Sequence, residues 1–146
     1  MEIDLLDIPE QKALIRRENV RKAVEQLHHG LEAPHMPGPA RFSYRSYSTA
    51  HLRTENDGWE APPHEVVNAW FEHFKGSFPE YSSDRLLGEL LGMTAHADRR
   101  MRAFRLGERK VPYGIWRRFL VMTGRVSQEI IPVMVIVDDV ESQEKL

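Results

Sequence analysis

The sequence predicts a mainly α-helical protein, in which a domain of four to five helices follows an N-terminal helix and precedes a short C-terminal β-strand. Two observations predict the helices. Apolar residues recur at helical spacing in five separate segments, and glycines stand where several of these segments end. A third observation predicts the strand, because one apolar run near the C-terminus is dense in β-branched residues. At 146 residues and 41% apolar composition, the chain is long enough to bury a sizeable core.

The first 33 residues form an N-terminal segment that contains a predicted helix. Pro9 stands where a helix tolerates its missing N–H, and Gly30 stands where the helix would end. Apolar residues at i, i+4, i+7 and i+11 give the helix one face to bury, namely Val20, Val24, Leu27 and Leu31. Its charges are mixed in sign, so we interpret it as a packing or dimerisation helix.

Residues 34–61 are predicted to be a proline-rich linker. Five prolines fall between Ala33 and Pro63, and helical signals are few. A short strand is expected at Arg41–Tyr47, because Phe42 and Tyr44 alternate with polar residues there.

The helical domain is predicted to span residues 62–127 and to begin with a helix from about His64 to Phe74. A second helix has Ser82 or Ser83 as its N-cap and ends at Gly92. Its apolar face is formed by Leu86, Leu87, Leu90 and Leu91. In this helix Gly88 would allow a crossing helix to approach closely.

Two further helices complete the domain. In the first, Thr94 is the expected cap, and the stripe of Ala97, Met101 and Phe104 turns Arg99 and Arg102 toward solvent. Gly107 ends it. The next helix begins near Gly114, and its apolar residues are Ile115, Trp116, Phe119, Leu120 and Met122.

The stretch from Ser82 to Arg125 resembles the helix-turn-helix domain of phage repressors of the Cro or XRE-like type. The resemblance is carried by the turn residues Gly88, Leu91, Gly92 and Met93, by the arginine-rich helix with Met101 and Phe104, and by RLGERKVPYGIWRRF, which is similar to G-x-R-x-x-P-x-x-x-W in repressors of mobile elements. It implies a helix-turn-helix domain of four to five helices that binds double-stranded DNA, with the arginine-rich helix in the major groove.

The chain departs from the family pattern at one point. Counting from Gly92, the family's buried aliphatic position falls on Asp98, whereas the apolar residue comes three residues later, at Met101. The three additional residues either extend the turn or lengthen the helix, so the family's base-reading positions do not transfer directly to Ala95 and His96.

Charge is concentrated in this stretch. Residues 99–118 contain eight Arg and Lys side chains against the single carboxylate of Glu108, a local net charge of +7 in a chain of net charge −2. A compact basic patch on an acidic protein is typical of a site for a polyanion. The predicted DNA-binding residues are His96, Arg99, Arg100, Arg102, Arg105, Arg109, Lys110, Arg117 and Arg118.

The C-terminal segment, residues 128–146, is predicted to contain a strand at Ile130–Val137. Pro132 lacks a backbone donor, so the strand should lie at a sheet edge. Such an edge needs a partner, either Arg41–Tyr47 or the same strand of a second subunit. Together with the apolar face of the N-terminal helix, this predicts a homodimer.

Several function classes are excluded by the residues present. The chain has no cysteine, and HEVVN has Asn68 where a zincin needs its second histidine, so we expect no enzyme, no metal and no cofactor. The acidic N-terminus and the absence of a long apolar segment predict a cytoplasmic protein that is not bound to a membrane.

Two functions remain. The first is a sequence-specific regulator of transcription that binds double-stranded DNA, in a phage or mobile element. The alternative is a protein-binding inhibitor on the same helical frame, like an antitoxin or an anti-CRISPR protein, which would act on a nucleoprotein or toxin complex.

Overall fold

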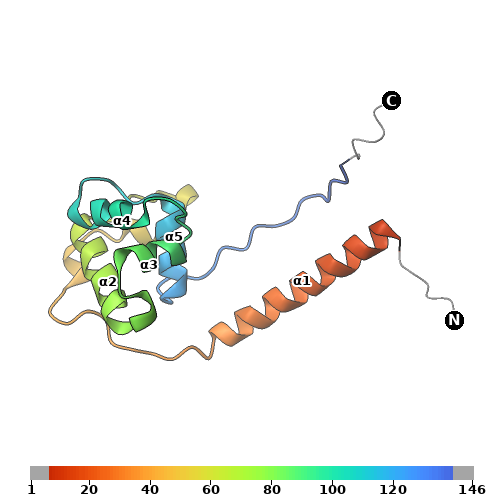
Figure 1. Cartoon of the computed structure of the whole chain (residues 1–146). Coiled ribbons are helices and arrows are strands. Elements are labelled where there is room, and N and C mark those ends of the chain that lie inside the picture. The colour runs from red at the N-terminus through yellow and green to blue at the C-terminus, as the bar shows by residue number, and fades with distance from the viewer. Residues whose placement is uncertain (1–6, 140–146) are drawn as a thin grey trace. The chain divides into compact units, whose positions relative to one another are not determined.

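The computed structural model describes residues 7–139 and is mainly helical (Figure 1). Its α-helices are α1 (Ile8–Gly30), α2 (His64–Ser77), α3 (Asp84–Leu90), α4 (Ala97–Leu106) and α5 (Tyr113–Met122). Short 3₁₀ helices lie at Tyr44–Ser46, Ala50–Leu52, Glu55–Asp57 and Pro79–Tyr81. The chain divides into two compact units, Met1–Pro37 and Gly38–Leu146, which are described separately.

The first unit contains α1, and the predicted N-terminal helix is confirmed. Asp7 caps the helix in a capping box: its Oδ1 accepts from the Glu10 backbone N at 2.8 Å, and Glu10 Oε2 accepts from the Asp7 backbone N at 3.3 Å. No residue of α1 is buried. The apolar stripe that includes Val20, Val24 and Leu27 is therefore open to solvent.

The second unit is built around aromatic side chains of α2 and α5. The rings of Trp70 and Trp116 stack with centroids 5.7 Å apart, and Phe71 and Phe119 pack against Trp116. All four side chains are buried. Helix α4 packs against both α2 and α3, and the aromatic contacts connect α2 with α5. Helices α2, α3, α4 and α5 therefore form one bundle (Figure 1).

Glycines end α3 and α4 as predicted. Gly92 has φ +96°, its N–H donates to Glu89 O, and the next N–H, of Met93, donates to Gly88 O. This pattern is a Schellman motif, which satisfies the last carbonyls of α3 and folds Met93 back into the core. Gly107, at φ +80°, ends α4.

Gly88 provides the close approach of α3 and α4 that its position predicts. A Cβ atom on Gly88 would lie 2.9 Å from the Ala97 Cβ and 3.0 Å from the Met101 Cγ. Both distances are shorter than ordinary van der Waals contact. The spacing between α3 and α4 therefore requires a glycine here.

The predicted strands are not present. Residues 130–137 are assigned to no strand, and Arg41–Tyr47 contains the 3₁₀ helix Tyr44–Ser46 instead. In fact no β-strand occurs anywhere in residues 7–139. Alternation and β-branching describe side chains that would suit a strand, but a strand forms only where a neighbour accepts its backbone hydrogen bonds.

Part of the segment predicted as a linker packs on the bundle. Ala50 and His51 are buried, and Trp116 Nε1 donates to His51 Nδ1 at 3.2 Å. Burial lowers the pKa of His51 from 6.5 to about 4, with the nearby charge of Arg125 as the second cause. The guanidinium of Arg125 lies 3.9 Å above the Trp70 ring, and burial lowers its own pKa to about 10. His51 is therefore a neutral hydrogen-bond acceptor within the core.

None of the described helices is long and apolar enough to span a bilayer.

We predict that Gly88→Ala lowers the free energy of unfolding by about 1–3 kcal/mol, because the added methyl group overpacks the contact between α3 and α4. Gly76→Ala is the matched control. Gly76 lies in α2, and a Cβ there would meet nothing within 4 Å. Because alanine is more favourable than glycine in a helix by up to about 1 kcal/mol, this variant should be at least as stable as the wild type. Urea unfolding of the two variants measures the difference. Equal stability would mean that α3 and α4 do not approach as closely as described.

We predict that His51 makes stability depend on pH. The unfolded chain protonates His51 below pH 6.5, whereas the folded protein keeps it neutral down to about pH 4. The unfolded state therefore binds more protons in this window, and stability falls by about 2–3 kcal/mol as the pH drops from 6.5 to 4. His51→Asn retains an acceptor for Trp116 but does not titrate, so it should lack this contribution. Urea unfolding of the wild type and of His51→Asn at pH 7.5 and pH 4.5 measures this contribution. If the free energy of unfolding depends equally on pH in the two proteins, the prediction is contradicted.

Candidate nucleic-acid interface

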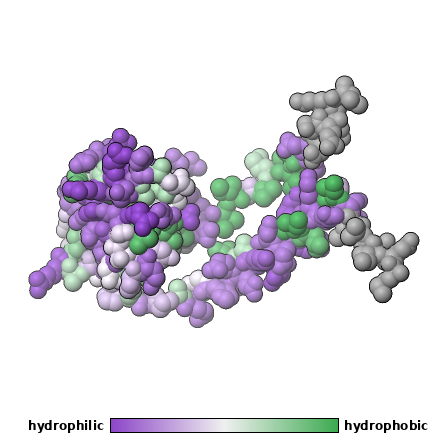
Figure 2. All heavy atoms as spheres, viewed as in Figure 1, coloured by the Kyte–Doolittle hydropathy of each residue, from purple (hydrophilic) through white to green (hydrophobic). Residues whose placement is uncertain are grey.

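The candidate interface is centred on α4, whose two faces differ in chemistry. Its inner face buries Ala97, Met101 and Phe104 against α2 and α3. Arg99 and Arg102 are exposed on the outer face, and Arg100 is half-buried at its side. This arrangement confirms the predicted helical register. In Figure 2 the surface over α4 is largely hydrophilic.

The turn between α3 and α4 is long. The helix begins at Ala97, so Thr94, Ala95 and His96 extend the turn and are all exposed. The expected cap at Thr94 is not formed: His96 is the N-cap residue, and its side chain makes no cap hydrogen bond. His96 has the left-handed backbone φ +53°, ψ +35°, which costs about 1 kcal/mol or more for a residue other than glycine.

His96 and Arg99 form a local pair at the start of α4. Arg99 Nη2 lies 2.8 Å from His96 Nδ1, so the guanidinium donates to the imidazole ring. Because both side chains are exposed, the pair presents the remaining donors of the guanidinium to solvent.

A basic loop follows α4 and is fixed at both ends. At Gly107, an added Cβ would lie 2.8 Å from the His64 Cδ2, so the backbone of the loop sits directly on α2. At the other end Val111 is buried in the core. Between these anchors Arg109 and Lys110 are exposed.

Arg118 of α5 lies beside the turn between α3 and α4. A Cβ on Gly92 would be 3.6 Å from Arg118 Nη1, and the arginine is exposed. Six of the predicted site residues make no ion pair with a carboxylate in the described part of the chain: Arg99, Arg100, Arg102, Arg109, Lys110 and Arg118. Their charges are available to an external anion.

Arg105, another predicted site residue, is held inside the bundle. Its Nε and Nη2 donate to the two oxygens of Asp84 at 3.0 and 2.6 Å, and its Nη1 donates to Asn68 Oδ1 at 3.2 Å. Lys75 Nζ reaches the same carboxylate at 2.8 Å. The side chains of Arg105 and Asp84 are each only 16% exposed. Arg105 therefore joins α2, α3 and α4.

The ionisation of Asp84 fits this arrangement. Burial is the largest single influence on its pKa and opposes ionisation, but hydrogen bonds from Arg105 and Lys75 outweigh it and lower the pKa. The hydrogen bond to Asp84 raises the pKa of Arg105 in turn. Both groups are charged at neutral pH.

Arg117 is likewise engaged within the protein. Its Nη1 donates to Leu52 O at 3.3 Å and its Nη2 to Ser127 O at 3.1 Å, while Nε lies 3.8 Å from Glu129 Oε2. The side chain is 13% exposed. Arg117 thus connects α5 to the segment before the bundle and to the segment that follows it.

The sequence reasoning missed Asp84, the residue that decides the role of Arg105. The two residues are 21 positions apart, so no helical spacing relates them. The available signal was weaker: an acidic residue in the first turn of a short helix, where the helix dipole favours a negative charge.

Known proteins offered no match. The sequence matched no protein-family model and no curated protein, and the structure matched no solved structure.

We predict that Arg105→Ala lowers the free energy of unfolding by about 2 kcal/mol, because it leaves the half-buried Asp84 carboxylate without its bidentate partner. Arg102→Ala is the matched control on the same helix and should stay within about 0.5 kcal/mol of the wild type. Thermal unfolding compares them. If both variants are equally stable, Arg105 does not hold the helices together. In a double-mutant cycle, Asp84→Ala and Arg105→Ala should be strongly non-additive.

Proposed function

We propose that this protein is a sequence-specific regulator of transcription that binds double-stranded DNA, of the type found in phages and mobile elements. In this proposal α3, the turn and α4 are the helix-turn-helix, and α4 is the recognition helix. The observation that supports it most strongly is the outer face of α4, where arginines lie unpaired with carboxylates while the inner face is fixed in the core.

The dimensions and chemistry of α4 suit a major groove. An α-helix with its side chains is about 10–12 Å across, and the major groove is about 12 Å wide. Arginine can donate two hydrogen bonds to the N7 and O6 atoms of guanine, so Arg99 and Arg102 are the proposed base contacts. Arg109, Lys110 and Arg118 would contact phosphates and set the orientation of the helix.

The extended turn gives His96 a place in this proposal. Because α4 begins at Ala97, His96 stands immediately before the helix and next to Arg99. A strained backbone at such a position is a common property of functional sites. We therefore retain His96 among the proposed DNA contacts, whereas the internal bonds of Arg105 and Arg117 favour a structural role for these two.

We predict selective, salt-dependent binding of double-stranded DNA. The probe is a library of duplexes with a randomised central segment, from which repeated selection should enrich one sequence. If the three proposed phosphate contacts, Arg109, Lys110 and Arg118, each neutralise one phosphate, log K should fall against log salt with a slope on the order of −3. Fluorescence anisotropy measures both affinity and slope.

Variants distinguish the roles within this surface. Arg102→Ala should cost about 1–3 kcal/mol of discrimination between the selected site and a mismatched site. Arg118→Ala should weaken all sequences alike and reduce the slope by about one unit. Arg85→Ala is the matched control, because Arg85 is exposed on α3 but is paired with Glu89. Binding that enriches no sequence, or that ignores salt, would contradict the proposal.

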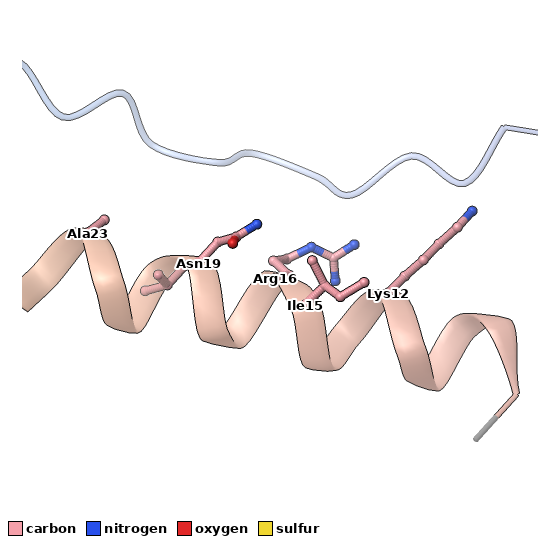
Figure 3. Close-up of a pocket in the computed structure, with 6 residues that line it drawn as sticks. Lys12, Ile15, Arg16, Asn19 and Ala23 are labelled. Carbon is pink, nitrogen blue, oxygen red and sulfur yellow. The ribbon is translucent and has the colours of Figure 1, made fainter. Parts of the chain in front are cut away.

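A second candidate function is supported by α1. This helix of 23 residues has no buried residue, and one of its faces carries Lys12, Ile15, Arg16, Asn19 and Ala23 (Figure 3). An exposed helix of this length suits a protein-binding inhibitor or a dimerisation element, and the homodimer stays a prediction. Recovery of the tagged protein from its host, with and without nuclease, separates the candidates: one DNA sequence supports the regulator, and one nuclease-resistant protein complex supports the inhibitor.

A further inference from the structure

The segment Ile130–Val137, the C-terminal apolar segment, has no cover among the described residues. Seven of its eight residues are large hydrophobics that are 49% to 94% exposed. The eighth is Pro132. Apolar residues are prominent along this segment in Figure 2. Such a concentration of exposed apolar side chains marks an interaction surface.

The segment starts at a fixed point on the bundle. The hydroxyl of Tyr113 donates to Glu129 Oε2 at 2.8 Å, and Arg117 Nη2 donates to Ser127 O at 3.1 Å. Both donors belong to α5. The apolar segment therefore leaves the bundle directly after two anchored residues.

The backbone of the segment is unpaired as well. Residues 130–137 make no backbone–backbone hydrogen bond within the described chain, although six of the eight are isoleucine or valine. These residues suit a strand. Pairing with the edge of a sheet would satisfy the backbone groups along one side of the segment and help to cover its side chains.

A second copy of this chain is a poor partner for such pairing. The part of the protein that the structure describes offers no sheet edge, and a lone two-stranded ribbon is marginal in water. The segment is also bracketed by acidic residues, Glu129 on one side and Asp138 and Asp139 on the other. Pairing two copies in either direction would place carboxylates opposite carboxylates, which is unfavourable.

Pro132 fixes which edge of the segment can pair. In a strand, the N–H and C=O of alternate residues point to the same side. Pro132 has no N–H, so its side must be the free one. Ile131, Val133, Val135 and Val137 then direct their backbone groups toward the partner. The proline also prevents a further strand from adding to the free edge.

We propose that residues 130–137 add as an edge strand to the β-sheet of a different protein, whose exposed edge is apolar and flanked by basic residues. The interaction is independent of the basic surface around α4. A DNA-bound copy would thereby recruit this second protein.

The test uses the full chain with the photo-crosslinking residue p-benzoylphenylalanine in place of Ile131, expressed in the native host. A chain that carries the same residue in place of Met36, which is exposed outside the segment, is the matched control. The expected result is one cross-linked species, specific to the Ile131 position, whose cross-linked peptide lies in an edge strand with basic flanks.

Two proline variants test the strand geometry. Val135→Pro removes an N–H from the pairing edge. It should reduce the cross-linked yield about tenfold, because one backbone hydrogen bond to the partner strand is lost and the adjacent one is weakened. Met134→Pro removes an N–H from the free edge and should change the yield by less than about twofold. Cross-linking to a second copy or to α1, no species above the control, or equal effects of the two prolines would each overturn the proposal.

Discussion

The architecture of the second unit depends on the side chain of Trp116. It is fully buried, stacks on Trp70 of α2, and donates its indole N–H to His51. One residue thereby joins α5, α2 and the segment before the bundle. Because the indole N–H is buried, it needs an acceptor, and His51 can accept at Nδ1 only in the neutral state that burial favours. Arg117 and Arg118 adjoin Trp116 in sequence, so its position also sets theirs.

Arginines that are close together in the sequence have different roles because they differ in how far their side chains are buried. Arg102 and Arg105 are three residues apart on α4, yet Arg102 is exposed while Arg105 forms a bidentate pair with Asp84. Arg117 bonds to backbone carbonyls, whereas its neighbour Arg118 is exposed beside the turn. A count of charges over the whole stretch therefore overstates the number of cations that are free to bind an anion. It includes Arg105 and Arg117, which bond within the protein.

Local signals in the sequence predicted much of the fold. The apolar periodicity of α4 and the glycine stop at Gly92 were confirmed, since both depend on residues within one or two turns. The predicted C-terminal strand is not present, because a strand depends on a pairing partner, and residues 7–139 supply none. The ion pair of Arg105 with Asp84 and the hydrogen bond from Trp116 to His51 were not predicted, because they too depend on partners that are distant in the sequence. Each joins residues 21 or 65 positions apart, and no spacing rule reaches so far.

The two surfaces for which we propose functions are places where the chain departs from local rules of stability. His96 holds a left-handed backbone and makes no side-chain cap hydrogen bond, whereas an N-cap residue typically has an extended backbone and caps the helix with its side chain. Residues 130–137 leave apolar side chains and backbone groups bare to water. Elsewhere in the described bundle, glycines close the C-terminal ends of α3 and α4, and the partly buried charges of Lys75, Asp84 and Arg105 are paired with one another. Departures of this kind are expected at functional sites, where an external partner supplies the missing contacts. The bundle supplies the stability that allows both surfaces to remain open.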